Sequence, residues 1–353
     1  MAARLKHLAE RWIFPLAVRD SAGSILVITL WSISFLATLA VILSFYARQK
    51  TTLVRRLDER DKLYLVAEAG VNKAIMQIVR RSEKDESCFA LNDPLRDNAA
   101  KFKDIDIGDA KANVSYVIYG GDGMPQIKWG VVDEESKVNI NKFDLAVLRR
   151  LFQIVLGIYD TEAEELAAAV IDWRDADSEP CIPSGSAEDF YYKSLPYSYE
   201  AKDAEFQSLE EILMVKDMTE ERFSKLKDYI TIYGGDKVNI NTASRPVLLA
   251  LGLGEDIVDK IISFRSGEDR LEGTKDDNIF RGAIGVAPQL SQAYSLNDSE
   301  VSLLGQVAER YLSCNSEYFM IRSLGNLNNK KDTIEVTSAV DRNGRVLCWR
   351  QDN

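Results

Sequence analysis

The sequence predicts an α+β protein that has one long N-terminal helix, a small antiparallel sheet and a large, mostly α-helical domain inserted between the strands of that sheet. Three observations lead to this prediction. Residues 25–47 are uncharged and mainly apolar, strand-like segments stand both before residue 133 and after residue 315, and a pentapeptide recurs 100 residues apart in the sequence between them.

The first predicted element is a helix over residues 24–81. Its apolar part, residues 25–47, would measure roughly 34 Å at about 1.5 Å per residue, which is enough to cross a hydrocarbon core of about 30 Å. From Leu57 to Ile78 apolar residues recur at steps of three and four, so the helix is expected to continue as an amphipathic segment. This combination is typical of a pilin spine. The alternative is a plain membrane anchor followed by an unrelated helix.

Residues 1–23 form a polar, basic segment that ends in Gly23, directly before the apolar run. This arrangement resembles a type IV prepilin leader, which a prepilin peptidase removes by cutting after the glycine. The resemblance implies cleavage between Gly23 and Ser24. It also places Ile28 at the fifth mature position, where most prepilins carry glutamate, and a subunit without that carboxylate is typical of the end of a filament. The count of Lys and Arg on the two flanks by itself favours the opposite orientation, with the far flank cytoplasmic.

Five strands are predicted outside the helical insertion, because their sequences are rich in β-branched and aromatic residues. They are Val114–Tyr119, Gln126–Val132, Tyr318–Leu324, Thr333–Val340 and Arg345–Trp349. Gly120–Pro125 predicts a turn between the first two, and Asn343-Gly344 is a strong hairpin signal between the last two. Residues 82–133 and 315–353 are therefore expected to form one pilin-like α+β domain, interrupted by an inserted domain at residues 134–314.

The insertion contains an internal repeat, because Lys137–Asn141 recurs as Lys237–Asn241 and two helices are predicted after each copy. The repeats cover about residues 137–174 and 237–265. Their predicted helices are Leu145–Leu156 and Glu162–Arg174 in the first copy, and Val247–Leu251 and Glu255–Arg265 in the second. Two further helices, 209–215 and Glu220–Tyr229, are expected between the copies. Capping boxes are expected at Ser208–Glu211 and Thr161–Glu164.

Charge and residue usage exclude several kinds of site. The 353 residues include 44 Lys and Arg against 55 Asp and Glu, and the net charge of −11 disfavours a protein that binds nucleic acid. The one histidine, His7, falls in the leader, so the mature chain would lack a Ser-His-Asp triad, a Cys-His pair and a His-ligated zinc site. The four cysteines form no CxxC pair, which disfavours a thiolate zinc site.

A cluster of carboxylates follows the predicted helix that ends at Arg174. Six carboxylates fall within 18 residues, namely Asp172, Asp175, Asp177, Glu179, Glu188 and Asp189, and the prolines and glycine among them predict a loop. Like charges in a compact loop need a cation, and oxygen ligands on a flexible loop suit Ca²⁺. The candidate ligands are Asp175, Asp177, Glu188 and Asp189, with Asp172 and Asp203 in addition. The alternative is a solvated acidic surface.

Three other features are weighed against simpler explanations. A second acidic loop, residues 268–277, has the composition of a Ca²⁺ site, but a solvated surface is favoured there. The glycines of Leu251–Gly254 are those that bring backbone amides to a DNA phosphate in some helix-hairpin-helix units, but the acidic flanking residues favour a packing role. Cys314 and Cys348 stand at the two borders of the C-terminal strands, where a disulfide would form if this part of the chain were periplasmic.

Several short sequence motifs follow one another along the chain: Trp129–Asp133, Lys137–Asn141, Asp172–Asp177, Gly185–Asp189, Tyr191-Tyr192, Pro196-Tyr197, Phe206–Ile212 and Val238–Ala243. These motifs and their order resemble those of the K subunit, GspK, of type II secretion systems, over roughly residues 18–350. The second repeat, residues 238–265, is itself similar to a helix-hairpin-helix unit. The lack of a glutamate at the fifth mature position also agrees with this family.

The resemblance implies a minor pseudopilin with a pilin-like scaffold and an inserted helical domain. It implies a single-pass protein of the bacterial inner membrane, with the bulk of the chain periplasmic and a place at the tip of the pseudopilus. The implied partners are the I and J minor pseudopilins, then the H subunit and the major pseudopilin, with prepilin peptidase as the processing enzyme. The resemblance also associates Ca²⁺ with the cluster after Arg174.

The expected function is therefore that of an assembly subunit, not an enzyme, which starts a pseudopilus and supports export of folded proteins through the outer membrane. The alternative from another class is a membrane-anchored helix-hairpin-helix protein that binds DNA for uptake; the acidic charge argues against it. A calcium-dependent hydrolase is a more distant third, because the sequence offers no nucleophile and base that can be paired.

Overall fold

The computed structural model of the chain describes residues 22–83, 88–119, 124–182, 187–328 and 332–352. The predicted leader lies outside the described residues except for Ala22 and Gly23, and so does most of the predicted turn at residues 120–125. The chain divides into two compact units, Met1–Asp61 and Lys62–Asn353.

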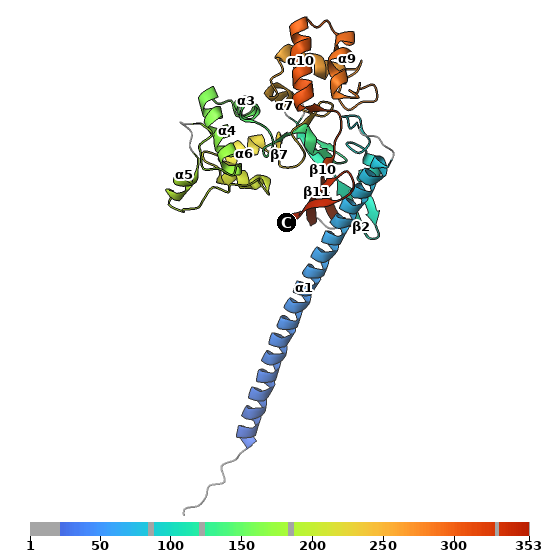
Figure 1. Ribbon diagram of the computed structural model, residues 1–353. Helices are drawn as coiled ribbons and strands as arrows, with labels where there is room; N and C mark the ends of the chain where they lie inside the picture. The colour runs from blue at the N-terminus through green and yellow to red at the C-terminus, as the bar shows by residue number, and fades with distance from the viewer. Residues whose placement is uncertain (1–21, 84–87, 120–123, 183–186, 329–331, 353) are drawn as a thin grey trace, which may run out of the picture. The chain divides into compact units, whose positions relative to one another are not determined.

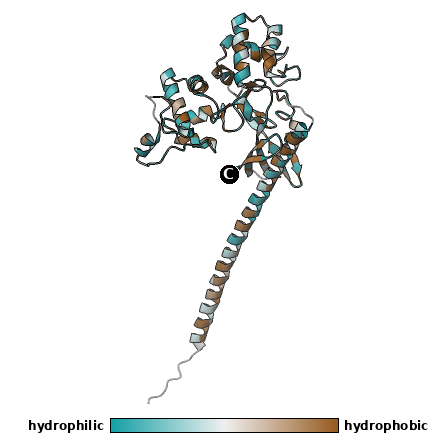
Figure 2. Ribbon diagram, viewed as in Figure 1, coloured by the Kyte–Doolittle hydropathy of each residue, from teal (hydrophilic) through white to brown (hydrophobic). Residues whose placement is uncertain are grey.

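The described part of the first unit is entirely helical and belongs to helix α1, Ala22–Ser82. Its apolar side chains face outward: Ile25, Trp31 and Phe35 are each more than 60% exposed. Figure 2 shows this apolar run along α1. Within the described residues, α1 is the one helix long and apolar enough to cross a membrane. Large apolar side chains exposed in this way need lipid or neighbouring helices as their surroundings.

The second unit contains a six-stranded antiparallel sheet covered by the end of α1 (Figure 1). Its order is β1-β2-β10-β11-β12, and β5 also pairs with β10. The strands are β1 Ile105–Ile107, β2 Ala110–Val114, β5 Val132–Asp133, β10 Tyr318–Leu327, β11 Thr333–Asp341 and β12 Val346–Asp352. The short helix α2, Ala99–Phe102, precedes them. Apolar residues of α1 from Leu63 to Ile78 pack with the sheet in one core.

Strand β10 is central because it carries partners on both edges. Along one edge it pairs with β11, from Tyr318 opposite Asp341 to Asn326 opposite Thr333. Its other edge is shared between β5, where Phe319 lies opposite Asp133, and β2. Two segments separated by more than 180 residues in sequence are thereby joined in one sheet, which confirms the prediction of an antiparallel sheet built from both ends of the chain.

Helix α1 crosses the sheet at close range, and two small residues make this possible. A Cβ added to Gly325 of β10 would lie 2.3 Å from the carbonyl oxygen of Leu63, and one added to Gly70 would lie 2.2 Å from the hydroxyl of Ser323. Contacts this short do not occur between real Cβ atoms and backbone, so larger residues at Gly325 would force the helix off the sheet.

A separate core belongs to the helical part of the chain, between Val138 and Cys314. Its helices are α3 Leu145–Leu156, α4 Asp160–Arg174, α5 Asp189–Lys193, α6 Glu220–Leu226, α7 Arg245–Ala250, α8 Glu255–Arg265, α9 Val286–Ala293 and α10 Asp298–Tyr311. Short 3₁₀ helices occur at η1 Glu134–Ser136, η2 Leu209–Met214 and η3 Ala283–Gly285. The predicted bounds of α3 and α8 are confirmed to the residue.

The two sequence repeats form the same local structure. In the first, β6 Val138–Asn139 pairs in parallel with β7 Ile230–Thr231; in the second, β8 Val238–Asn239 pairs in parallel with β9 Leu312–Ser313. The last arginine of the second helix in each repeat donates back to the pentapeptide: Arg174 to the carbonyl of Ile140, and Arg265 to that of Ile240. The repeated sequence is therefore a structural duplication.

The buried carboxylate of Asp133 connects the sheet to the helical part. It is 3% exposed and accepts four hydrogen bonds. The donors are the backbone N–H of Glu135 at 2.9 Å, the Thr242 hydroxyl at 2.5 Å, the Ser316 hydroxyl at 2.7 Å and the Asn239 amide at 3.1 Å. Burial raises the pKa of Asp133, and these donors oppose the shift. Buried donors from the second repeat and from the segment before β10 therefore share one acceptor on the sheet.

Several predicted details are wrong. The strand expected at Val114–Tyr119 is interrupted at Ser115, and its second half, β3 Tyr116–Tyr119, pairs with β4 Pro125–Lys128 as a separate hairpin outside the main sheet. Ser208 makes no side-chain cap, and the segment it precedes is the 3₁₀ turn η2. Helix α4 begins at Asp160, before the expected capping box, and its N-cap residue Tyr159 makes no side-chain cap. The hairpin at Asn343-Gly344 is confirmed, because β11 and β12 pair on either side of it.

Candidate metal site

The carboxylates of the candidate site lie between the end of α4 and the start of α5. Asp175 is the C-cap residue of α4, and Glu188 is the N-cap residue of α5. The two helices are joined by aromatic packing, since the rings of Trp173 and Tyr192 are 5.2 Å apart in an edge-to-face arrangement. Burial of these two rings fixes the ends of both helices. It thereby brings Asp175 and Glu188, which are 13 positions apart in the sequence, close together.

Three carboxylates form the centre of the site. One oxygen each of Asp175, Asp177 and Glu188 lies within 4.8 Å of the other two. Asp177 is exposed, Asp175 is half-buried, and Glu188 is 5% exposed. For a cation among the three oxygens, Asp177 would be the ligand exposed to solvent and Glu188 the ligand buried in the protein.

Two oxygens of this group are buried without a hydrogen-bond donor: Oδ1 of Asp175 and Oε1 of Glu188. An unpaired buried carboxylate oxygen is costly, because it has lost water and gained nothing in exchange. The arrangement therefore fits a cation, which would supply the missing partner to both atoms. Oxygen-only ligands are those preferred by Ca²⁺, which takes about 6–8 of them.

The electrostatics of the cluster agree with this fit. Burial, then the charges of Asp172, Asp175, Asp203 and Asp177, raise the pKa of Glu188 to about 7. Burial and the charges of Asp177 and Asp172 likewise raise the pKa of Asp175. A divalent cation would reverse both effects, because it favours the ionised carboxylates.

The remaining predicted ligands have other roles in the structure. Both oxygens of Asp172 accept backbone N–H bonds, from Cys181 at 2.7 Å and Ala187 at 3.2 Å, so Asp172 shapes the loop. Asp203 is exposed and lies near enough to raise the pKa of Asp175 and Glu188.

The prediction of Asp189 as a ligand is not supported by its contacts. Its carboxylate forms a salt bridge with Lys193 at 2.6 Å and accepts the backbone N–H of Ala201 at 3.0 Å. Asp189 is the first residue of α5 and Lys193 is one turn later, so the side chain points along the helix and not into the cluster.

The second acidic loop, by contrast, satisfies its own carboxylates. Asp276 accepts the N–H groups of Glu268 and Asp269 and the hydroxyl of Thr274, and these bonds lower its pKa to about 2. Asp277 accepts the N–H of Gly273 at 2.7 Å. These donors already stabilise the ionised carboxylates of Asp276 and Asp277, so the hydrogen bonds of the loop do the work that an ion would do.

Of the two helix-hairpin-helix glycines, Gly252 lies against protein and Gly254 is exposed. Arg150 donates to the carbonyl of Ala250 at 2.7 Å, and a Cβ at Gly252 would lie 3.4 Å from its guanidinium. The next helix, α8, starts with Glu255 and Asp256. Carboxylates at this end repel a phosphate, so the hairpin packs one repeat against the other.

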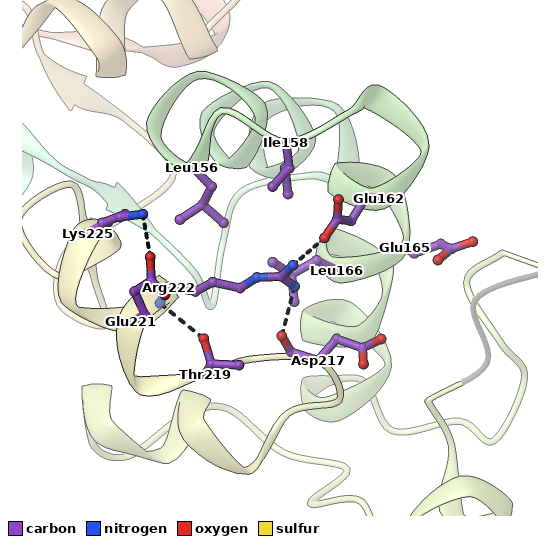
Figure 3. Close-up of a pocket in the computed structure, with 10 residues that line it drawn as sticks. All are labelled: Leu156, Ile158, Glu162, Glu165, Leu166, Asp217, Thr219, Glu221, Arg222 and Lys225. Atoms are coloured by element: carbon purple, nitrogen blue, oxygen red, sulfur yellow. Dashed lines mark hydrogen bonds and ion pairs between the residues drawn. The ribbon is translucent and has the colours of Figure 1, made fainter.

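A pocket of about 680 Å³ lies between α4, α6 and the segment after α3 (Figure 3). Apolar side chains line one side of it. On the other, Arg222 pairs with Glu162, and Lys225 pairs with Glu221 at 2.8 Å. Because these charges neutralise one another, the residues lining the pocket include no activated nucleophile and base.

The structure places the two cysteines of the predicted Cys314–Cys348 pair in different parts of the fold. Cys314 is buried in the helical core, and Cys348 is exposed on β12 opposite Ala339. The neighbour of Cys314 is instead Cys88: Cys88 lies opposite Asn315 in an isolated antiparallel bridge. The sequence places Cys88 far from the C-terminal strands, so this proximity could not be predicted from the borders of those strands.

The aromatic support of the site was also missed as a functional feature. Trp173 packs against Tyr192 and Tyr199, and its indole N–H donates to Glu211 at 3.2 Å. A signal was present in the sequence, because Leu166, Val170 and Trp173 recur at helical spacing and so share the buried face of α4.

Comparisons with known proteins identify the relatives of this fold and site. A family model described as type II secretion system, protein K, matches residues 126–235. Type II secretion system protein K of Pectobacterium carotovorum is 32% identical over 129 residues, which are 35% of this chain and 38% of that protein. The protein K of Pseudomonas aeruginosa is 32% identical over 148 residues, or 38% of this chain and 44% of that protein. The matched segments span less than half of these relatives.

Among solved structures, the GspK-GspI-GspJ complex from the type II secretion system of enterotoxigenic Escherichia coli contains a similar chain. The TM-score is 0.63 at 17% identity, and the match covers 85% of this chain and 99% of that one. At this identity the match establishes a shared fold, which agrees with the predicted α+β class. The resemblance to the K subunit of type II secretion systems is therefore confirmed, with residues 126–235 matching the protein K family model.

Proposed function

We propose that this protein is a minor pseudopilin of a type II secretion system, which starts the pseudopilus and supports export of folded proteins through the outer membrane. The observation that carries the proposal is the protein K domain at residues 126–235, set in a fold that matches nearly the whole of a GspK chain. That GspK chain was solved in complex with GspI and GspJ, so the I and J minor pseudopilins are the proposed partners here. The H subunit and the major pseudopilin would follow them in the filament.

The proposed location is the inner membrane, crossed once, with the second unit in the periplasm. The apolar stretch of α1 supports this, because its exposed side chains need lipid. The proposed place is the tip of the filament. Two features support it: Ile28 at the fifth mature position carries no carboxylate for a neighbour's amino terminus, and the helical part adds bulk that would hinder stacking of a further subunit.

Calcium is the proposed structural ion. Asp175, Asp177 and Glu188 would hold it, with Asp203 as a nearby charge and Asp172 as the residue that shapes the loop. When bound, the ion supplies positive charge to a group of carboxylates that otherwise repel one another. Its role is to fix the end of α4 against the start of α5.

The proposed role involves no catalysis, and the energy for filament growth would come from ATP hydrolysis by other proteins. The alternative, a DNA receptor, is not favoured, because Glu255 and Asp256 flank the hairpin and the net charge is −11. Clear binding of duplex DNA by the full-length protein at low salt would favour the alternative instead.

Processing of the leader gives a direct test of the proposal. Mature protein extracted from membranes should begin at Ser24, because prepilin peptidase is expected to cut after Gly23. Replacement Gly23→Ala should slow the cut, since a side chain at this position crowds the peptidase, and unprocessed protein should accumulate. The measurement is N-terminal sequencing together with the shift in mobility on a gel.

The matched control is Ser21→Ala, which introduces the same residue two positions away and should be processed normally. A mature protein that still begins near Met1 in a host with active prepilin peptidase would contradict the assignment as a pseudopilin.

A further inference from the structure

Two cysteines that are 226 positions apart in the sequence lie together where the segment after α1 meets the end of the second repeat. Cys88 faces Asn315 across an antiparallel bridge, and the N–H of Phe89 donates to the carbonyl of Cys314 at 3.2 Å. The side chain of Cys314 is part of the helical core, and Cys88 packs against that same core. Both cysteine side chains therefore contact the helical core.

The backbone on both sides of this pair is held in place. The carbonyl of Cys88 accepts a hydrogen bond from Arg81, and that of Phe89 accepts the Asn239 amide at 2.8 Å. On the other strand, Ser313 pairs with Asn239 in the β8–β9 ladder. A disulfide needs Cα atoms about 4.4–6.8 Å apart. Cys88 lies opposite Asn315, the residue that follows Cys314, so the two cysteines are diagonal neighbours across the bridge.

We propose that Cys88 and Cys314 form a disulfide that joins the start of the pilin-like part covalently to the end of the helical part. The proposal rests on the proposed function in one respect, because it needs the second unit to lie in an oxidising compartment such as the periplasm. The remaining cysteines are elsewhere: Cys181 is exposed beside the carboxylate cluster, and Cys348 is exposed on β12.

The two thiols differ in accessibility, and this sets the order of the reaction. Cys88 is half-buried and Cys314 is buried; burial, and then the neighbouring Cys88, raise the pKa of Cys314 to about 12. Cys88 therefore meets the oxidant first. Its thiolate attacks a sulfur of a protein disulfide carrier, forms a mixed disulfide and releases one carrier thiolate. The thiolate of Cys314 then attacks the Cys88 sulfur and releases the second carrier thiolate.

In this exchange the two cysteines lose two electrons and two protons, and the carrier disulfide is reduced to a dithiol that takes them up. The product closes a loop of more than 220 residues, so it restricts the unfolded chain strongly. Oxidised protein is therefore expected to melt about 5–10 °C above reduced protein.

The test uses the full-length protein, extracted into detergent from its host with N-ethylmaleimide present to trap free thiols. After digestion without reduction, mass spectrometry should find a peptide that links Cys88 to Cys314, while Cys181 and Cys348 carry the label. Cys88→Ser should remove the linked peptide and make the melting temperature insensitive to dithiothreitol. Cys348→Ser, the matched control, should leave both unchanged.

A second sample, reduced and then incubated with excess oxidised glutathione, separates the pairing from the location. If the link forms there but not in cells, the pairing is supported and the periplasmic location of this unit is contradicted. If Cys88 and Cys314 remain labelled in both samples, or link to other cysteines, the proposed disulfide is overturned.

Discussion

Replacement of Asp133 by alanine is expected to lower the free energy of unfolding by about 3–5 kcal/mol, the largest loss among the substitutions considered. The carboxylate is the shared acceptor for Thr242, Ser316 and Asn239, and its removal leaves these buried donors without a partner. Each buried donor left unsatisfied costs about 1–3 kcal/mol. The measurement is chemical unfolding of the full-length protein in detergent, followed by tryptophan fluorescence.

Two further variants identify the cause of that loss. Asp133→Asn keeps the shape and one oxygen acceptor, so it should cost less than alanine. Asp106→Ala makes the same change at an exposed position of β1 and should shift the unfolding free energy by no more than about 0.5 kcal/mol. If Asp133→Ala were as mild as Asp106→Ala, Asp133 would not be the connection between the two cores.

Millimolar Ca²⁺ is expected to raise the melting temperature of the full-length protein relative to EDTA. An ion that binds only the folded state at a hundredfold excess over Kd stabilises it by about 2.7 kcal/mol, which for a chain of this length raises the melting temperature by roughly 4 °C. Asp175→Ala combined with Asp177→Ala should abolish the difference. Mg²⁺ should have a smaller effect, because it requires tighter octahedral geometry and loses water reluctantly.

The stabilisation by Ca²⁺ should also depend on pH, and the protonation of Glu188 determines whether it rises or falls with pH. Its folded pKa of about 7 lies above its ordinary value of 4.5. Without an ion, the stability that Glu188 contributes is therefore fully present below pH 4.5 and is lost as pH rises through about 7. Ca²⁺ binds the ionised form, so its stabilising effect should be larger at pH 8 than at pH 5. In the Glu188→Gln variant, the increase in stabilisation by Ca²⁺ between pH 5 and pH 8 should largely disappear.

The second acidic loop provides the matched control for calcium. Asp276→Ala combined with Asp277→Ala removes two carboxylates whose partners are backbone N–H groups and the Thr274 hydroxyl. This variant should be less stable in both buffers but should keep the difference between Ca²⁺ and EDTA. Identical melting curves of the unaltered protein in Ca²⁺ and EDTA would show that Asp175, Asp177 and Glu188 form only a solvated acidic surface.

Local patterns in the sequence predicted the local elements well. Helices α3 and α8 were predicted to the residue, because each has an apolar face at helical spacing and ends at a clear boundary. Helix α10 was not predicted, although Asn297 and Glu300 form a true capping box at its start. The expected box at Ser208 is absent, since the residues after it form only a 3₁₀ turn.

The structure brings together three of the predicted ligands, and the separation of the others has a physical cause. Composition located the carboxylate cluster, but burial and orientation decide which oxygens converge. The spacing of Asp189 and Lys193 is that of an i, i+4 ion pair, and the Asp189 carboxylate forms this pair. Contacts between residues far apart in sequence could not be predicted. Asp133 accepts a hydrogen bond from Thr242, and Cys88 lies beside the segment that contains Cys314, only because the sheet and the second repeat fold together.

The most direct measurement of the central proposal is isolation of the full-length protein with its proposed partners. A tagged chain, co-expressed with the I and J minor pseudopilins of the same host and extracted into detergent, should copurify with both as one complex. An unrelated single-pass membrane protein carrying the same tag serves as the control. If I and J copurify with each other while this chain, folded and processed at Ser24, elutes alone, its assignment as the K subunit of the pseudopilus would be contradicted.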